Sequence, residues 1–360
     1  MKKITATHAR IILACSFLCT IAAWPAGAAA TAGKLSVVAT LPNLGSIAQE
    51  IGADHVDVMT IASGLQDAHF VDPKPSFIVK LRSADLILVN GLDLEIGWVP
   101  PLTQGARNSK LLPGGPGYID CSSRISVLEI PTGTLSRAEG DVHPFGNPHY
   151  LGDPLNAEQV AGVIADAFKR TRPADAEFFE KRRADFVKRL HAALFGPELV
   201  DLVGGAKLSR LAQGFELEAF LQSGSVDGKP LASHLGGWLG KLRPYAGVKV
   251  VTYHKDYSYF EKRFQLDVAE YVEPKPGIPP SLKHIDELTQ RLSAGDIRLL
   301  ITRPYVEHRS TDQLSEKSKL PVVTLPLEVG GAPEATDFFK LFDYVTSQIV
   351  TALGPPPAGR

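Results

Sequence analysis

Short apolar runs rich in β-branched residues alternate along most of the chain with segments whose apolar residues recur every three or four positions. The runs predict buried strands and the segments predict amphipathic helices. This alternation is typical of an α/β fold with parallel sheets. The expected strands are residues 35–40, 56–61, 84–90, 118–120, 125–130, 248–253, 268–272, 297–302 and 322–325. The expected helices between and after them are residues 44–51, 75–83, 257–264, 282–292, 312–317 and 337–353.

The middle of the chain departs from this alternation. A helix is expected from residue 156, and after a break at Arg172-Pro173 a long, charged amphipathic helix is expected over residues 175–194. A helix of that length can connect two lobes. Residues 197–244 combine many glycines with short apolar segments, which predicts an insertion of short helices. We therefore expect an N-terminal α/β lobe (33–155), a helical linker (156–196) and a C-terminal α/β lobe (197–353) that contains the insertion.

The first residues have the layout of a secretory signal. A basic start is followed by an apolar run over residues 11–24 and by the small residues 26–30. The apolar run is short for a membrane span. We expect a signal peptide over residues 1–32 and export to the periplasm. Cys15 is a poor lipid-attachment site because little apolar sequence precedes it, so a soluble protein is preferred over a lipid-anchored one.

Composition excludes some classes of partner and of site. The chain is 44% hydrophobic and 21% charged, with a formal net charge of -1, which gives no electrostatic case for nucleic acid or an anionic membrane surface. Of the three cysteines, Cys15 and Cys19 fall in the signal and only Cys121 remains. This excludes a disulfide within one mature chain and argues against cysteine ligation of zinc.

Three histidines occupy settings in which α/β folds gather ligands. His149 lies in a turn with two Pro and two Gly, His69 lies in the Pro-flanked segment 67–73, and His254 follows the strand-like run 248–253. Imidazole nitrogen is a preferred zinc donor. Spacing alone does not show that the three converge, and a lone histidine in a turn is more often a surface residue. His143, six residues before His149, is either an alternate ligand or simply solvated.

Several motifs in succession make the sequence similar to the zinc- and manganese-binding solute-binding proteins of bacterial ABC importers, in their periplasmic zinc-uptake branch. These motifs are Asp67-Ala68-His69 with Pro73 and Pro75-Ser76, residues 84–92 with Glu95, Asn147-Pro148-His149 with Asp153-Pro154, Tyr253-His254 with Tyr259-Phe260, and Glu273-Pro274. The resemblance implies two lobes joined by one long helix, with a single metal in the cleft. It implies His69 and His149 as ligands from the first lobe and His254 from the second. It also implies delivery of the metal to an ABC permease, and we expect a monomer.

The third ligand position favours zinc. Manganese-selective members of the family tend to place a carboxylate where this chain has His254, and three imidazoles suit zinc better than the harder manganese ion. The family's fourth ligand is usually an Asp before the last helix. Here the nearest carboxylate is Glu328, so the prediction is ligation by Glu328 or by water. The chain also lacks a long His-rich loop, and its segment 196–244 is longer than the usual connection.

Two other classes of function use a similar site. An exported zinc hydrolase would also use three protein ligands and a water molecule. No His-Glu-x-x-His helix is present, and no obvious general base accompanies the histidines. A metal-binding adhesin or a zinc chaperone would share the site and differ only in its partner.

Overall fold

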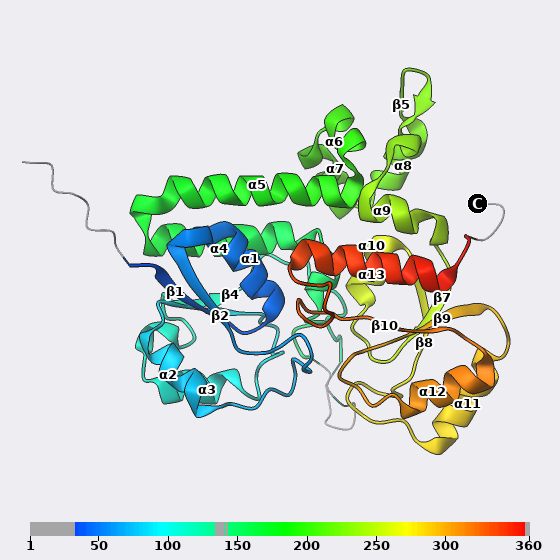
Figure 1. The fold of residues 1–360 in the computed structure, drawn as a ribbon, viewed down its shortest axis with the longest axis horizontal. Helices are drawn as coiled ribbons and strands as arrows, with labels where there is room; N and C mark the ends of the chain where they lie inside the picture. Colours follow the sequence, from blue (N-terminus) through cyan, green and yellow to red (C-terminus); the bar gives the residue numbers. More distant parts are fainter. Residues whose placement is uncertain (1–32, 134–139, 141–142, 357–360) are drawn as a thin grey trace, which may run out of the picture. The chain divides into compact units, whose positions relative to one another are not determined.

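Two four-stranded parallel sheets organise the chain, in the orders β2-β1-β3-β4 and β10-β9-β7-β8 (Figure 1). The computed structural model describes residues 33–133, 140 and 143–356, and the elements named below belong to one unit that begins at Lys34. The predicted fold class, two α/β halves with parallel sheets, is confirmed. The expected signal peptide, residues 1–32, lies outside the described residues.

The first half consists of strand–helix units that closely match the predicted ones. Its elements are β1 (Leu35–Ala39), α1 (Pro42–Gly52), β2 (Val56–Thr60), α2 (Pro75–Ser83), β3 (Leu86–Val89), α3 (Val99–Ala106) and β4 (Tyr118–Asp120). All four residues of β3 are buried, as the continuous apolar run requires of a strand in the interior of a covered sheet. Each of the three helices has a proline at its start, where the missing N–H costs nothing.

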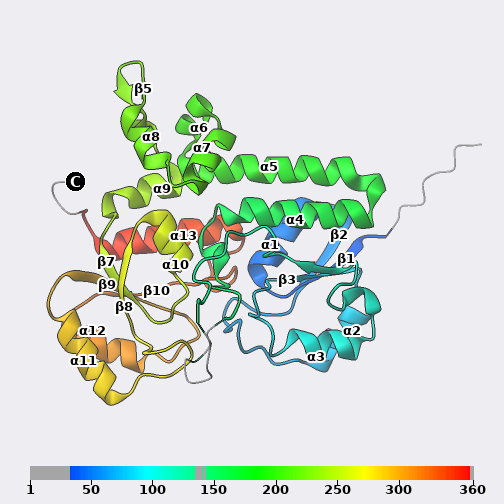
Figure 2. The same ribbon diagram turned by 180° about the vertical axis from the view of Figure 1, so that it is seen from behind.

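Helices fill the middle of the chain. Helix α4 (Asn156–Thr171) is followed by α5 (Ala176–Phe195), which agrees with the long helix expected over residues 175–194. Helix α5 contacts α1 of the first half, the preceding helix α4, and α9 (Gly237–Leu242) (Figure 2). It therefore packs against elements that come before and after it in the chain. No helix among the described residues is long and apolar enough to cross a membrane.

The predicted insertion of short helices is present, with one addition. It contains α6 (Pro197–Val203), α7 (Gly205–Gln213) and α8 (Leu217–Ser223), followed by the strands β5 (Ser225–Val226) and β6 (Lys229–Pro230). These two strands form an antiparallel hairpin that the sequence reading missed. Its turn residues, Asp227 and Gly228, both have positive φ, which is the Asp-Gly signal of a tight hairpin.

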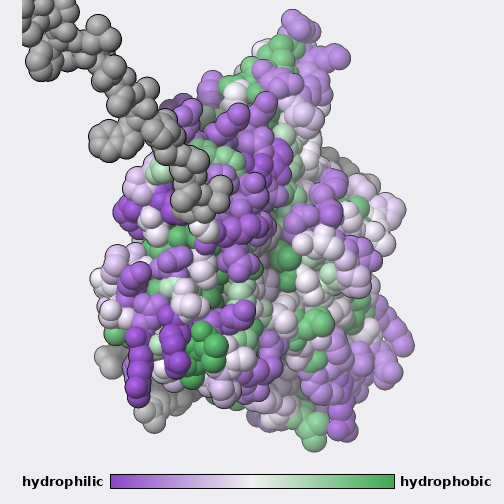
Figure 3. Space-filling view, turned by 60° about the vertical axis from the view of Figure 1, so that its left-hand side comes forward, coloured by the Kyte–Doolittle hydropathy of each residue, from purple (hydrophilic) through white to green (hydrophobic). Residues whose placement is uncertain are grey.

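The second half returns to strand–helix units. Its elements are β7 (Lys249–Thr252), α10 (Ser258–Phe264), β8 (Asp267–Tyr271), α11 (Leu282–Leu292), β9 (Ile297–Thr302), α12 (Arg309–Ser318), β10 (Val322–Thr324) and α13 (Phe338–Leu353). All of them fall within two or three residues of the predicted bounds. On the face seen in Figure 3, the apolar side chains of described residues occur in small groups among polar ones.

The strand expected over residues 125–130 is wrong. This segment has no regular structure, because its backbone groups bind a side chain of α10 and the loop of His149 rather than a neighbouring strand. The amide of Leu128 donates to the Tyr259 hydroxyl at 2.9 Å, and the Leu128 carbonyl accepts from the amide of Asn147 at 2.9 Å. Glu129 has a φ of 57°, which also ends an extended run. The segment therefore supports the loop that carries His149.

The loop before α13 is joined to the start of α1. The Asn43 amide donates to Oε2 of Glu328 at 2.8 Å, and the Asn43 side chain bonds the backbone of Leu327 and Val329 at 2.8 and 2.9 Å. Helix α1 lacks a side-chain cap of its own, so Glu328 satisfies one of its free N–H groups from a distant segment. Burial raises the pKa of Glu328 to about 8, and the Asn43 amide opposes this increase.

We predict that Phe186→Ala lowers the free energy of unfolding by about 3–5 kcal/mol, as expected for deleting a fully buried aromatic ring. Phe186 lies on α5, with ring centroids 6.4 and 5.3 Å from those of Phe338 and Phe339 on α13. Urea denaturation measures the change. The exposed Lys188 on the same helix is the matched control, and Lys188→Ala should change stability by less than about 0.5 kcal/mol. Equal effects of the two substitutions would contradict this account of α5.

We further predict that Glu328→Gln stabilises the metal-free protein, with a benefit that grows as the pH rises. The carboxyl group has a pKa of about 8 in the folded protein and an ordinary value of 4.5. Below pH 4.5 it is protonated in both the folded and the unfolded state and costs little stability. Between pH 4.5 and pH 8 only the unfolded state loses its proton, so the cost to the folded state increases with pH. The amide keeps an acceptor for Asn43 and does not ionise. After allowance for the partial exposure of the side chain, the gain should reach on the order of 2 kcal/mol at pH 8. Urea denaturation of both proteins from pH 5 to pH 8 measures it, and a constant difference across that range would contradict the prediction.

Candidate metal site

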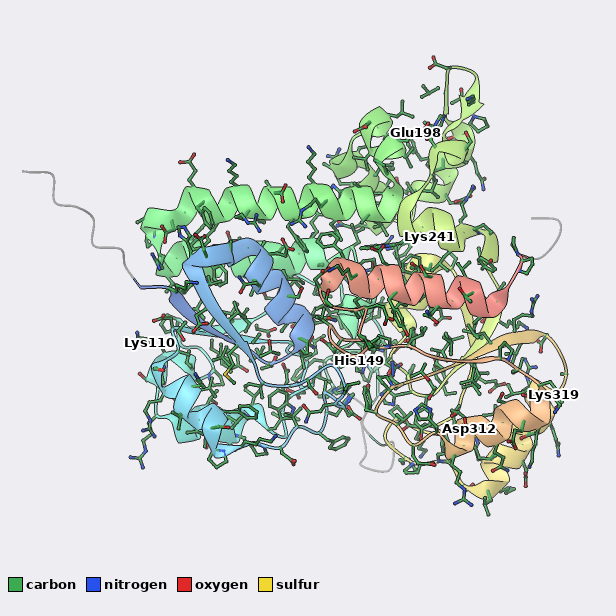
Figure 4. All side chains as sticks on the ribbon, in the orientation of Figure 1. Lys110, His149, Glu198, Lys241, Asp312 and Lys319 are labelled. Atoms are coloured by element: carbon green, nitrogen blue, oxygen red, sulfur yellow. The ribbon has the colours of Figure 1, made fainter. Side chains whose placement is uncertain are left out.

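The structure brings His69, His149 and His254 together. His69 lies in the loop after β2, His149 precedes α4, and His254 follows β7, so the three reach one place from the loops around the two sheets. One ring nitrogen from each of the three histidines lies within 4.8 Å of the other two. Among the described residues, these three side chains form the group that could hold a metal ion. Figure 4 labels His149 between the elements of the first sheet and α13.

An aspartate holds the ring of His69. Oδ1 of Asp67 accepts from the backbone amide of His69 at 3.0 Å and lies 2.7 Å from Nδ1 of its ring. Trp98 anchors the same turn, because its Nε1 donates to the Ala68 carbonyl at 2.9 Å. Burial opposes ionisation of Asp67, but the bonds and charge of His69 outweigh it and lower the pKa of that carboxyl. With Nδ1–H held by Asp67, Nε2 of His69 carries the free lone pair.

Glu273 performs the same task for His254, and no such role was predicted for it. Its Oε2 lies 2.6 Å from Nδ1 of His254 and also accepts from the Gly277 amide at 3.0 Å. Strands β7 and β8 are parallel, and the Glu273 amide donates to the Tyr253 carbonyl at 3.0 Å. Residues that follow paired ends of parallel strands lie side by side. Both residues come just after predicted strands, but the sequence did not show that these two strands are neighbours.

The loop of His149 is fixed through its backbone. Asn147 accepts from the His149 amide at 2.9 Å and donates to the Lys255 carbonyl at 3.1 Å, while Asn90 donates to the Pro148 carbonyl at 3.0 Å. Nε2 of His149 is buried and has no hydrogen-bond partner among the described residues. Burial, with the neighbouring histidines and Arg303, lowers the pKa of His149 well below its ordinary value. A neutral ring with an unpaired, buried nitrogen suits a metal ligand.

Glu95 supports the turn beneath these loops. Its buried carboxylate accepts from the amides of Asn90 and Gly91 at 2.6 and 3.1 Å and from the Thr40 hydroxyl at 2.7 Å. Burial raises the pKa of Glu95 to about 6. The next residues, Leu92 and Asp93, have φ values of 56° and 61°, a left-handed conformation that costs roughly 1 kcal/mol for each. The bonds to Glu95 help to offset that cost and hold the turn in place.

Glu328 is not a member of the histidine group. It lines a cavity of about 30 Å³ together with His149 and Tyr305, but one of its oxygens is used by the start of α1. Its ligation of a metal stays a prediction that this geometry does not favour.

His143 lies beside the group. Its Nε2 is 3.1 Å from Nε2 of His69, and the centroids of the two rings are 5.1 Å apart. Burial lowers the pKa of His143 to about 4, with smaller contributions from His69 and His254. The ring is therefore partly buried against His69, and its interpretation as an alternate ligand stays a prediction.

The donor set fits zinc. Neutral imidazoles with their Nδ1–H groups fixed by carboxylates, as in His69 and His254, are a common arrangement around zinc. Zinc–nitrogen bonds of about 2.0–2.1 Å place the ligands of a tetrahedral site about 3.3 Å apart. The ring nitrogens of the three histidines lie within 4.8 Å of one another, which allows a wider spacing than this. Small side-chain rotations would therefore bring all three nitrogens to bonding distance of one ion.

Comparison with known proteins identifies the family of this chain. The family described as "Zinc-uptake complex component A periplasmic" (ZnuA) matches residues 37–194 and 240–352. The manganese ABC transporter substrate-binding lipoprotein PsaA of Streptococcus anginosus is 30% identical over 165 residues, which is 45% of this chain and 50% of the relative. The match therefore spans about half the length of that curated relative. The iron ABC transporter substrate-binding lipoprotein MtsA of Streptococcus pyogenes serotype M1 is 23% identical over 81% of this chain and 79% of the relative.

Solved structures share the same fold. A crystal structure of ZnuA has a TM-score of 0.63 at 18% identity and covers 89% of this chain and 100% of that one. The Mn-bound periplasmic metal binding protein from Candidatus Liberibacter asiaticus has a TM-score of 0.61 at 18% identity over the same shares. Residues 195–239, which hold most of the insertion, fall outside the family match.

The relatives bear the names of substrate-binding components rather than enzymes, so the hydrolase alternative gains no support. The family match covers well over half of the chain, and the two-sheet fold agrees with it. The chain therefore belongs to the ZnuA family of metal-binding substrate-binding proteins of ABC importers.

Proposed function

We propose that this protein captures zinc outside the cytoplasm and delivers it to the permease of an ABC importer. The observation that carries the proposal is the meeting of His69, His149 and His254 at one point. Two of these rings are oriented by carboxylates, and the third has a buried nitrogen without a partner. Such a set binds a divalent ion, and the nearest carboxylates, Asp67 and Glu273, are bonded to ring nitrogens rather than free to act as a general base.

Zinc is the proposed ion because the cluster consists of imidazoles. Manganese prefers oxygen donors, and the carboxylates nearest to the rings, Asp67 and Glu273, are bound to the Nδ1 side of their histidines. Relatives of this chain are named for manganese and for iron, so the choice among ions depends on this chain's own donors.

Export to the periplasm and function as a monomer complete the proposal. The signal layout of residues 1–32 supports export, and the family description names the periplasm. The relatives PsaA and MtsA are described as lipoproteins. We keep the soluble form as the proposal because Cys15 has little apolar sequence before it.

Release of the ion follows from the same geometry. His254 and Glu273 follow strands of the second sheet, whereas His69 follows a strand of the first. A small separation of these loops would remove one imidazole and lower the affinity for the ion. Protonation of the imidazoles would have the same effect, so acid should release the metal.

We predict that His149→Ala lowers zinc affinity by at least about 100-fold. Loss of a residue that merely orients a ligand typically costs 10–100-fold, and loss of a ligand should cost no less. Competition with a fluorescent chelator measures the change. The control is His234→Ala, which removes a histidine bonded to Glu198 in the insertion and should leave affinity unchanged. Near-normal binding by the His149 variant would remove this residue from the site.

We also predict that zinc displaces manganese when both are offered to the metal-free protein. Metal content after dialysis against equal concentrations of the two ions should show one zinc per chain and little manganese. Retention of manganese in preference to zinc would contradict the proposed ion and leave the transport proposal standing. Failure to retain either ion would contradict both.

A further inference from the structure

We propose that His143 supplies the fourth ligand of the metal, so that the ion is held by four imidazoles. This inference rests on the proposed function. It goes beyond the predicted set of His69, His149, His254 and either Glu328 or water. The observations that carry it are the position of the His143 ring, the hydrogen bond that fixes the ring of His69, and the use of one Glu328 oxygen elsewhere.

The distance between the two rings suits a shared ion. Nε2 of His143 lies 3.1 Å from Nε2 of His69. Two ligands of a tetrahedral zinc ion with bonds of about 2.0–2.1 Å lie about 3.3 Å apart. His143 and His69 therefore already have the spacing of one edge of the coordination tetrahedron.

Proton positions lead to the same conclusion. Nδ1–H of His69 is directed at Asp67, so Nε2 of His69 presents a lone pair to His143. In the metal-free protein, a proton on Nε2 of His143 would join the two rings. If the proton of His143 is on Nδ1 instead, two lone pairs face one point, which a cation between them stabilises.

Closure of the shell needs a small movement of His143. It is not part of the group whose ligand atoms all lie within 4.8 Å, although its ring centroid is 5.1 Å from that of His69. Rotation of the ring about its side-chain bonds, with Nε2 kept near His69, would bring it over the open side of the three-histidine group. The proton that joined the rings would then move to Nδ1 of His143, so that the ring stays neutral and Nε2 is free to bind the ion.

The test replaces the proposed ligand with a thiol. In His143→Cys loaded with Co²⁺, a thiolate-to-cobalt charge-transfer absorption should appear, because the sulfur would enter the coordination sphere. Cys121, the cysteine that lies outside the expected signal, is fully buried, so wild-type protein should lack this band. The matched control is His234→Cys in the insertion, which should bind Co²⁺ without the band.

A second measurement does not depend on the cysteine variant. X-ray absorption at the zinc edge should show four imidazoles in wild-type protein and three with one oxygen in His143→Gln, with zinc affinity lowered by about 10-fold or more. Co²⁺ bound by His143→Cys without the band, or an unchanged zinc spectrum in His143→Gln, would overturn the assignment. Absence of metal binding in the wild-type protein would instead overturn the proposed function.

Discussion

The site depends on the hydrogen bonds between carboxylates and the Nδ1 atoms of two histidines. Asp67 fixes the ring of His69, and Glu273 fixes the ring of His254, at 2.7 and 2.6 Å. Each bond selects one tautomer and directs a lone pair toward the common point. Without them, imidazoles on loops would rotate, and binding of the ion would have to provide the free energy to order them. The preordered rings explain how a small group of side chains can hold one ion.

The rest of the chain keeps the two halves of this site in contact. Helix α5 packs on α1 and on α9, and the loop before α13 is bonded to Asn43 at the start of α1. Asp153, near His149, forms a buried bidentate pair with Arg263 on α10, at 2.9 and 2.8 Å. Asn147 adds a bond to Lys255, next to His254. These contacts surround the histidines, so a change in the relative position of the halves would change the positions of the proposed metal ligands.

Much of the fold and part of the site could be predicted from the sequence. Most strands and helices follow from the apolar pattern. The turns around His69 and His254 come after the parallel strands β2 and β7, whereas the turn around His149 precedes α4. The role of Glu273 could not be read without the register of β7 and β8, which pairs two distant segments. Glu328 was singled out because it is the nearest carboxylate in sequence, whereas its bond to α1 depends on the packing of the two halves. The ring of His143 could not be placed, because its printed side-chain contact is with His69, which is distant from it in the sequence.

The most direct test of the central claim is a crystal structure of the zinc-loaded protein with anomalous scattering recorded above and below the zinc absorption edge. The account predicts one strong anomalous peak, within bonding distance of ring nitrogens of His69, His149 and His254. Asp67 and Glu273 should remain bonded to the Nδ1 atoms of their histidines. A peak at another place, or a zinc ion bound to only one of these rings, would contradict the claim that three preordered imidazoles form the site.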